Sequence, residues 1–122
     1  MNRYKKTSFK MINSYKLNRD LLSHLPNLLP KYFPNGKLER NEYVMLNPTR
    51  QDRNLGSFRI NIKTGAWGDF AIGKKGFGII SLLIYATKSS FKEVVKELCL
   101  QTRLSLPNYY LDNRNKGGKY ER

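Results

Sequence analysis

Residues 57–70 read SFRINIKTGAWGDF, and this stretch predicts the centre of the fold. Polar and apolar side chains alternate strictly through residues 57–63, which is typical of a strand with one buried and one open face. A Thr-Gly pair then provides a tight reversal into residues 66–70. We therefore expect an antiparallel hairpin whose open face carries Arg59 and Lys63.

Other elements are expected on both sides of this hairpin. A further strand is indicated at residues 42–47, and Asn18 is expected to cap a short N-terminal helix. After a basic, glycine-rich loop, residues 79–86 are apolar nearly all round, as in a buried helix, and a capping box of Ser90 and Glu93 begins another helix. The sequence thus predicts an α+β fold. A small antiparallel β-sheet of three or more strands is flanked by an N-terminal helix and two C-terminal helices.

A chain of 122 residues has material for one hydrophobic core. We expect the folded domain at residues 17–101. It lies between a basic, weakly ordered arm at residues 1–16 and a basic, weakly ordered tail at residues 102–122, because both ends are rich in polar and charged residues.

The net charge of +14, from 23 Lys and Arg against 9 Asp and Glu, indicates a polyanionic partner. Residues 1–16 carry five basic side chains and no acid, and residues 102–122 carry five basic side chains and two acids. These basic residues follow no sustained amphipathic face. Nucleic acid is therefore favoured over an anionic membrane surface.

Several classes are excluded by what the chain lacks. One Cys and one His supply neither an internal disulfide nor a Cys/His zinc site, and they indicate a reducing, cytoplasmic location. No signal peptide is expected, and the longest apolar stretch, residues 77–86, is about half of the ~20 residues that cross a bilayer. The acidic residues are scattered without a D-x-D pair. We therefore do not expect the isolated chain to be an enzyme.

Four short segments carry a resemblance to a known family: NPTR at residues 47–50, GSFRIN at 56–61, TGAWGDFAIG at 64–73 and KKG at 74–76. They resemble the N-terminal zinc-ribbon domain of bacterial DNA primases of the DnaG type. The likeness is to the zinc-less form of that domain at the front of phage and plasmid primase-helicases, and it covers roughly residues 29–100.

The resemblance aligns four residues with the family's zinc ligands: Asn47, Arg50, Asp69 and Ile72. None of them is Cys or His, and Ile72 offers no donor, so zinc is expected to be absent and no cofactor is predicted. Since ligand positions lie close together, we expect Arg50 and Asp69 to form an ion pair in place of the metal, with Asn47 hydrogen-bonded nearby.

The resemblance also implies a role. In primases this domain holds the single-stranded template and does not polymerise, so we expect a non-catalytic, single-stranded-DNA-binding module of DNA replication and priming. It would belong to a phage, plasmid or integrated element. A replicative helicase or a primase catalytic subunit is the expected protein partner.

The expected phosphate contacts are basic residues of the open strand face and its adjoining loops: Arg53, Arg59, Lys63, Lys74 and Lys75. Trp67 has two interpretations, as a platform on which a base stacks or as a core residue packed against Phe58.

Two other functions remain open on the sequence. The chain can be an adaptor whose apolar helix surface docks a helicase or primase subunit, with the charge secondary. It can also be a fragment of a longer primase-helicase. Binding of single-stranded DNA and the neighbouring reading frames would distinguish these alternatives from the first.

Overall fold

A computed structural model describes residues 12–49 and 55–111 of the chain. Five strands form one antiparallel sheet in which each strand pairs with its neighbour in sequence. The strands are β1 (Lys37–Glu39), β2 (Glu42–Met45), β3 (Phe58–Asn61), β4 (Ala66–Asp69) and β5 (Lys74–Phe77). The fold is therefore α+β, as the sequence predicts.

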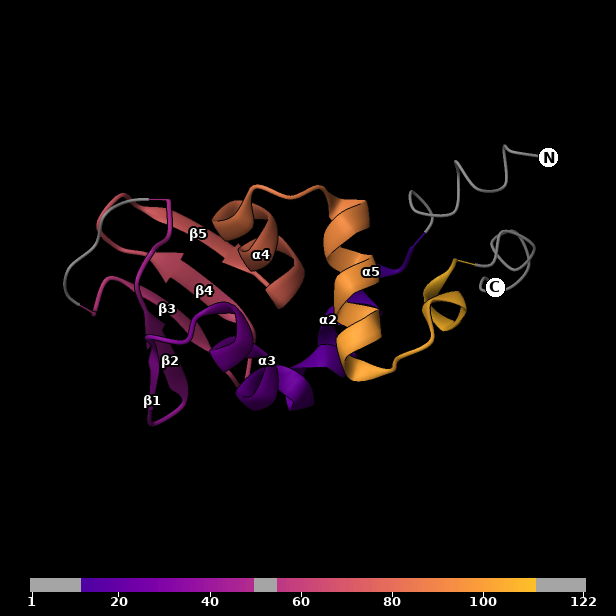
Figure 1. Cartoon of the computed structure of the whole chain (residues 1–122), viewed down its shortest axis with the longest axis horizontal. Helices are drawn as coiled ribbons and strands as arrows, with labels where there is room; N and C mark the ends of the chain where they lie inside the picture. Colours follow the sequence, from indigo (N-terminus) through magenta and orange to yellow (C-terminus); the bar gives the residue numbers. More distant parts are fainter. Residues whose placement is uncertain (1–11, 50–54, 112–122) are drawn as a thin grey trace, which may run out of the picture.

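Helices precede and follow the sheet. An N-terminal helical run consists of α2 (Ser14–Leu21), the 3₁₀ turn η1 (Leu22–His24) and α3 (Leu25–Tyr32). After the sheet come α4 (Ile79–Thr87), α5 (Phe91–Thr102) and the 3₁₀ turn η2 (Leu106–Tyr109). Figure 1 shows the sheet at one end of the molecule and α5 toward the other, with α3 and α4 between them. No helix in the described ranges is long and apolar enough to cross a membrane.

The first helix begins five residues earlier than its sequence signal predicts, at Ser14 rather than after Asn18. Asn13 is the N-cap, because its side chain accepts a hydrogen bond from the Lys16 N–H at 3.0 Å. The expected cap, Asn18, lies inside α2, and its Oδ1 instead accepts from the N–H of Ile80 at 3.4 Å. Asn18 thus joins α2 to the first turn of α4 rather than beginning a helix.

The capping box that predicts the last long helix is present. The Ser90 side chain accepts from the Glu93 N–H at 3.1 Å, and the Glu93 carboxylate accepts from the Ser90 N–H at 2.9 Å. The helix then buries Val94, Val95 and Leu98. These residues follow the i, i+1, i+4 spacing of a helix that packs one face on a core.

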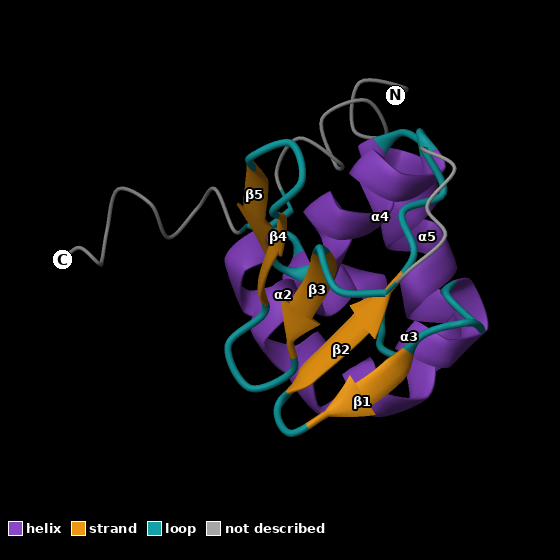
Figure 2. Cartoon of the chain, turned by 90° about the vertical axis from the view of Figure 1, so that its left-hand side faces the viewer, coloured by secondary structure: helices purple, strands orange, loops and turns teal. Residues whose placement is uncertain are grey.

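The central hairpin separates a buried face from an open face. Phe58 and Ile60 of β3 are fully buried, whereas Arg59 between them is partly exposed. Trp67 of β4 pairs with Ile60 and therefore lies on the buried face. Figure 2 looks onto the open face of the sheet, with the helices behind the strands.

Residues 74–77, which the sequence indicates as part of a basic loop, form strand β5 instead. Lys75 pairs with Gly68, and Gly76 pairs with Trp67. Gly76 faces the core, and the Trp67 ring fills the space that a side chain at this position would need. A Cβ on Gly76 would lie 2.5 Å from that ring. The strand therefore buries no apolar side chain of its own, and its sequence carries no β alternation.

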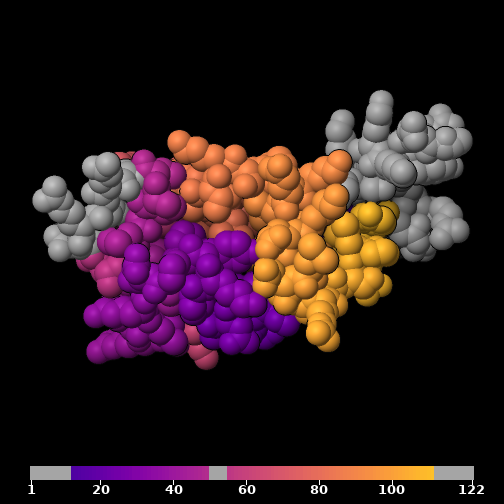
Figure 3. Space-filling view, viewed as in Figure 1, coloured from indigo at the N-terminus to yellow at the C-terminus, as the bar shows by residue number. Residues whose placement is uncertain are grey.

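Packed residues extend past the expected domain bounds of 17 and 101. Ile12 is buried and bridges Tyr110, and Tyr109 is buried with its hydroxyl donating to Asp20 at 2.7 Å. Figure 3 shows the end of the described chain, in yellow, lying against α5, in orange. Residues 1–11 and 112–122 of the predicted arm and tail lie outside the described residues.

Candidate nucleic-acid interface

Of the four residues that the sequence resemblance aligns with zinc ligands, two are in contact in the structure: Asn47 and Asp69. The Asn47 side-chain amide donates to Oδ2 of Asp69 at 2.5 Å, and both side chains are buried. Each residue also organises its own turn: the Asn47 Oδ1 accepts from the Thr49 N–H at 2.7 Å, and the Asp69 Oδ1 accepts from the Ala71 N–H at 3.2 Å. The turns after β2 and β4 are thereby joined.

The other two positions differ from this pair. The Ile72 side chain is exposed, and its contribution to the turn is a backbone hydrogen bond from its N–H to the Asp69 carbonyl at 3.2 Å. Arg50 lies outside the described residues, as does Arg53, so the predicted Arg50–Asp69 ion pair stays a prediction.

The donor atoms at these positions do not suit zinc. Ile72 has no donor atom, and the Asn47 amide nitrogen is engaged by Asp69 and by the Tyr85 hydroxyl at 2.9 Å. Within residues 12–49 and 55–111, no three His, Cys, Asp or Glu side chains come together in a way that would hold a metal.

An aromatic cluster lies beneath the joined turns. Phe58 makes edge contacts with Phe33, Trp67 and Tyr85 at centroid distances of 6.0, 6.3 and 6.0 Å. Trp67 and Tyr85 are stacked at 5.4 Å. Tyr85 also meets Asn47, so α4, β3 and β4 are all held together at this end of the sheet.

Trp67 is a core residue, so its stacking interpretation is not supported. The side chain is 5% exposed, its indole N–H donates to the Ser81 hydroxyl at 2.9 Å, and one ring face is covered by Tyr85. A base cannot reach this ring without unfolding part of the core. Of the two sequence interpretations, packing against Phe58 is the correct one.

Two phenylalanines that the sequence analysis did not select are exposed near the outer edge of the sheet. Phe70, directly after β4, is 67% exposed, and Phe77, the last residue of β5, is 68% exposed. A Cβ on Gly68 would touch the Phe70 ring at 3.6 Å, so this ring lies over the open face at β4. Phe77 lies two residues after Lys75 and thus on the same face, about 7 Å along the strand.

Lys75 lies on this open face between the two rings. It pairs with Gly68, is exposed and forms no ion pair with any described residue. Gly68 has no side chain, and the Phe70 ring lies over its position beside Lys75. We define Phe70, Lys75 and Phe77, with the backbone of Ala66 and Gly68, as the open-face site.

The other described residues that the sequence predicts as phosphate contacts differ in whether they can reach this site. Lys63 is exposed in the β3–β4 turn, at the end of the hairpin near Phe77. Lys74 is exposed but belongs to the opposite face, with its ammonium 5.7 Å from the Tyr85 ring centroid. Arg59 lies on the open face, but its guanidinium is held by Glu42 at 2.9 Å and by the Gly56 carbonyl at 2.6 Å.

A signal for the missed residues exists in the sequence. In KKGF the second and fourth residues share one strand face, and pairing with AWGD would place both beside glycine or alanine. Exposed apolar side chains that gather into one patch, unlike those scattered singly, are typical of a surface that meets a partner. Comparison with models of known protein families gives no match, and no curated protein matches the chain.

Proposed function

We propose that the chain is a non-catalytic module that binds single-stranded nucleic acid, with DNA during replication or priming as its target, through the open-face site. The observation that carries the proposal is that Phe70, Lys75 and Phe77 lie on one face of the sheet and that all three side chains are exposed. Proteins that bind single strands use aromatic rings for the bases and cations for the phosphates.

The charge of the chain supports this function. A net charge of +14 on 122 residues attracts a polyanion from a distance and raises the rate of encounter. Lys63 and Lys75 extend that field onto the sheet, whereas Arg59 supports the face mainly by holding β2 and β3 together through Glu42.

Exposed rings favour a single strand over a duplex. Bases in a duplex are already stacked on one another, so Phe70 and Phe77 gain a stacking partner only where bases are free. The resemblance to the template-holding domain of DnaG-type primases is in accord with this choice. A cytoplasmic location belongs to the same proposal, because a sequence with one cysteine, Cys99, forms no internal disulfide.

The test is a titration of a labelled single-stranded oligonucleotide with Phe77→Ala and Phe70→Ala. Loss of one stacked base weakens binding by about 1–3 kcal/mol, or about 5- to 150-fold. The matched control is Leu100→Ala, because Leu100 is another exposed apolar side chain but lies on α5.

Three results would contradict the proposal. The first is that wild-type protein does not bind the oligonucleotide at about 50 mM salt, where phosphate contacts are strong. The second is that all three variants bind as the wild type does. Equal affinity for duplex and single strand would leave only the charge as a binding determinant and would also contradict it.

A further inference from the structure

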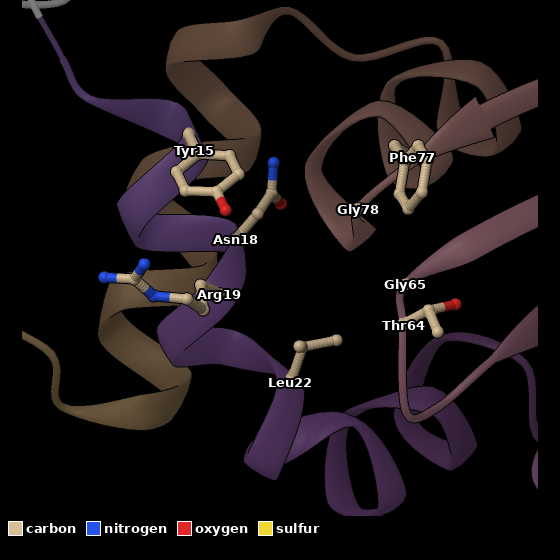
Figure 4. A pocket seen from close by; sticks show the side chains of 8 residues that line it. All are labelled: Tyr15, Asn18, Arg19, Leu22, Thr64, Gly65, Phe77 and Gly78. Atoms are coloured by element: carbon tan, nitrogen blue, oxygen red, sulfur yellow. The ribbon is translucent and has the colours of Figure 1, made fainter.

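A groove of about 520 Å³ opens between α2 and the edge of the sheet at β5. Eight residues line it: Tyr15, Asn18, Arg19, Leu22, Thr64, Gly65, Phe77 and Gly78. Its volume falls within the range of about 300–1,000 Å³ that is usual for small-molecule sites. Figure 4 shows Tyr15 and Phe77 on opposite sides of the groove, with Asn18 between them.

The floor of the groove is built by close packing. The Gly78 N–H donates to the Gly65 carbonyl at 2.7 Å, and both residues have positive φ, 84° for Gly65 and 89° for Gly78. A Cβ on Gly78 would lie 2.5 Å from the Asn18 side chain, so glycine is required for this approach. A rigid floor of backbone, Asn18 and Leu22 therefore lies between the two rings.

The walls are aromatic and uncovered. Tyr15 is 74% exposed, and Phe77 is the same ring that ends the open-face site. The groove is thus continuous with that site through one shared side chain. Two aromatic walls beside a mainly apolar floor suit a planar heteroaromatic ring, which gains stacking contacts on its faces.

Polar groups at the groove suit a nucleotide. The Asn18 Oδ1 is occupied by the Ile80 N–H, which leaves the Asn18 amide group as a donor for a base edge. The Arg19 guanidinium lies 5.5 Å from the Tyr15 ring centroid and extends away from the groove in Figure 4. It makes no ion pair within the described part of the chain, so it is available to a phosphate outside the groove.

We infer that this groove receives one unstacked nucleobase of the bound single strand, held between Tyr15 and Phe77, with Arg19 on the adjoining phosphate. The inference rests on the proposed function, because the strand reaches the groove from the open-face site. It adds a base-binding pocket to a surface that otherwise contacts bases from one side.

The experiment follows backbone amide shifts of the full chain while each deoxynucleoside monophosphate is added. We expect saturable shifts at Thr64, Gly65 and Gly78 in the wild type, the same shifts in Tyr15→Phe, and their loss in Tyr15→Ala. Deoxyribose 5-phosphate and inorganic phosphate serve as controls without a base. Shifts of equal size with these controls would show an anion site and overturn the inference.

Oligonucleotide affinity separates this inference from the proposed function. We expect Tyr15→Ala to weaken binding of the labelled strand about 5- to 150-fold, as for one lost stack, with the salt dependence unchanged because no cation is removed. If the wild type binds the strand but Tyr15→Ala binds it equally well and monophosphates leave the groove amides unmoved, the groove assignment is wrong and the open-face site stands. If the wild type binds no strand, both are wrong.

Discussion

The Asn47 side chain donates a hydrogen bond to the buried carboxylate of Asp69, and this contact links two turns that are 22 residues apart in sequence. Asp69 is 0% exposed, so its charge depends on such donors for stabilisation. The same Asn47 amide reaches the Tyr85 hydroxyl. A polar pair and an aromatic cluster thus hold this end of the sheet together.

Replacing Asn47 by alanine should destabilise the fold markedly. The substitution removes a donor to a buried carboxylate and the acceptor of the Thr49 N–H, so we expect the free energy of unfolding to fall by about 2–4 kcal/mol. Denaturant unfolding followed by circular dichroism measures it. The matched variant is Asn27→Ala, because Asn27 is exposed on α3 and should change stability by less than about 0.5 kcal/mol. Equal losses for the two variants would contradict a structural role for the buried pair.

Tyr109→Phe should flatten the pH dependence of stability at both ends. The Tyr109 hydroxyl and then Lys16 hold the pKa of Asp20 below 3.8, so this contribution is present above pH 3.8 and is lost as pH falls through the lower folded pKa. Burial, followed by the bond to Asp20, raises the pKa of Tyr109 to about 12. That contribution is complete below pH 10 and is lost as pH rises toward 12.

Thermal melting from acid to alkaline pH measures both limbs. Tyr110→Phe is the control, because Tyr110 is the adjacent tyrosine and is more exposed. Part of the alkaline limb should persist in Tyr109→Phe, since burial also raises the pKa of Tyr32 to about 12. A Tyr109→Phe profile parallel to that of the wild type would show that the hydroxyl does not couple η2 to α2.

The central hairpin and α5 were predictable because their signals are local. Alternation in residues 58–61 and the Ser90–Glu93 capping box each act within a few residues. Strand β5 was not, since its core-facing residue is Gly76 and the space there is filled by Trp67 from the neighbouring strand. The C-terminal boundary likewise depends on Tyr109 reaching Asp20, 89 residues away, which no local pattern records.

In the candidate site, too, some features follow from local sequence and others depend on contacts between strands. The exposure of Lys75 could be expected from its charge. Which of Trp67 and Phe77 is buried depends instead on whether β4 or β5, which pair with each other, places its large side chain in the core. Trp67 occupies the space over Gly76, so the indole is buried and Phe77 is left on the surface. Strand pairing, rather than residue type, decides which aromatic side chain is buried and which is exposed.

Gly76→Ala should therefore displace Trp67 and destabilise the protein. The added methyl would lie 2.5 Å from the indole, which is stacked on Tyr85 and bonded to Ser81 and cannot move freely. We expect a loss of about 1–3 kcal/mol and a change in the emission of Trp67, the single tryptophan. Gly68→Ala is the control, because its Cβ would meet its nearest atoms at 3.4 Å or more. Equal stability of the two variants would show that the space above Gly76 is not tightly filled.

Lys75→Gln should reduce the salt dependence of oligonucleotide binding. If Lys75 neutralises one phosphate, the slope of log affinity against log salt should become shallower by about 0.7 for a single strand. Lys96→Gln removes the same charge from the exposed side of α5, away from the open-face site, and should leave that slope as in the wild type. Both variants lower the net charge equally. A matching decrease in slope for the two would mean that the strand responds to total charge, whereas a decrease confined to Lys75→Gln would locate a phosphate beside Phe77.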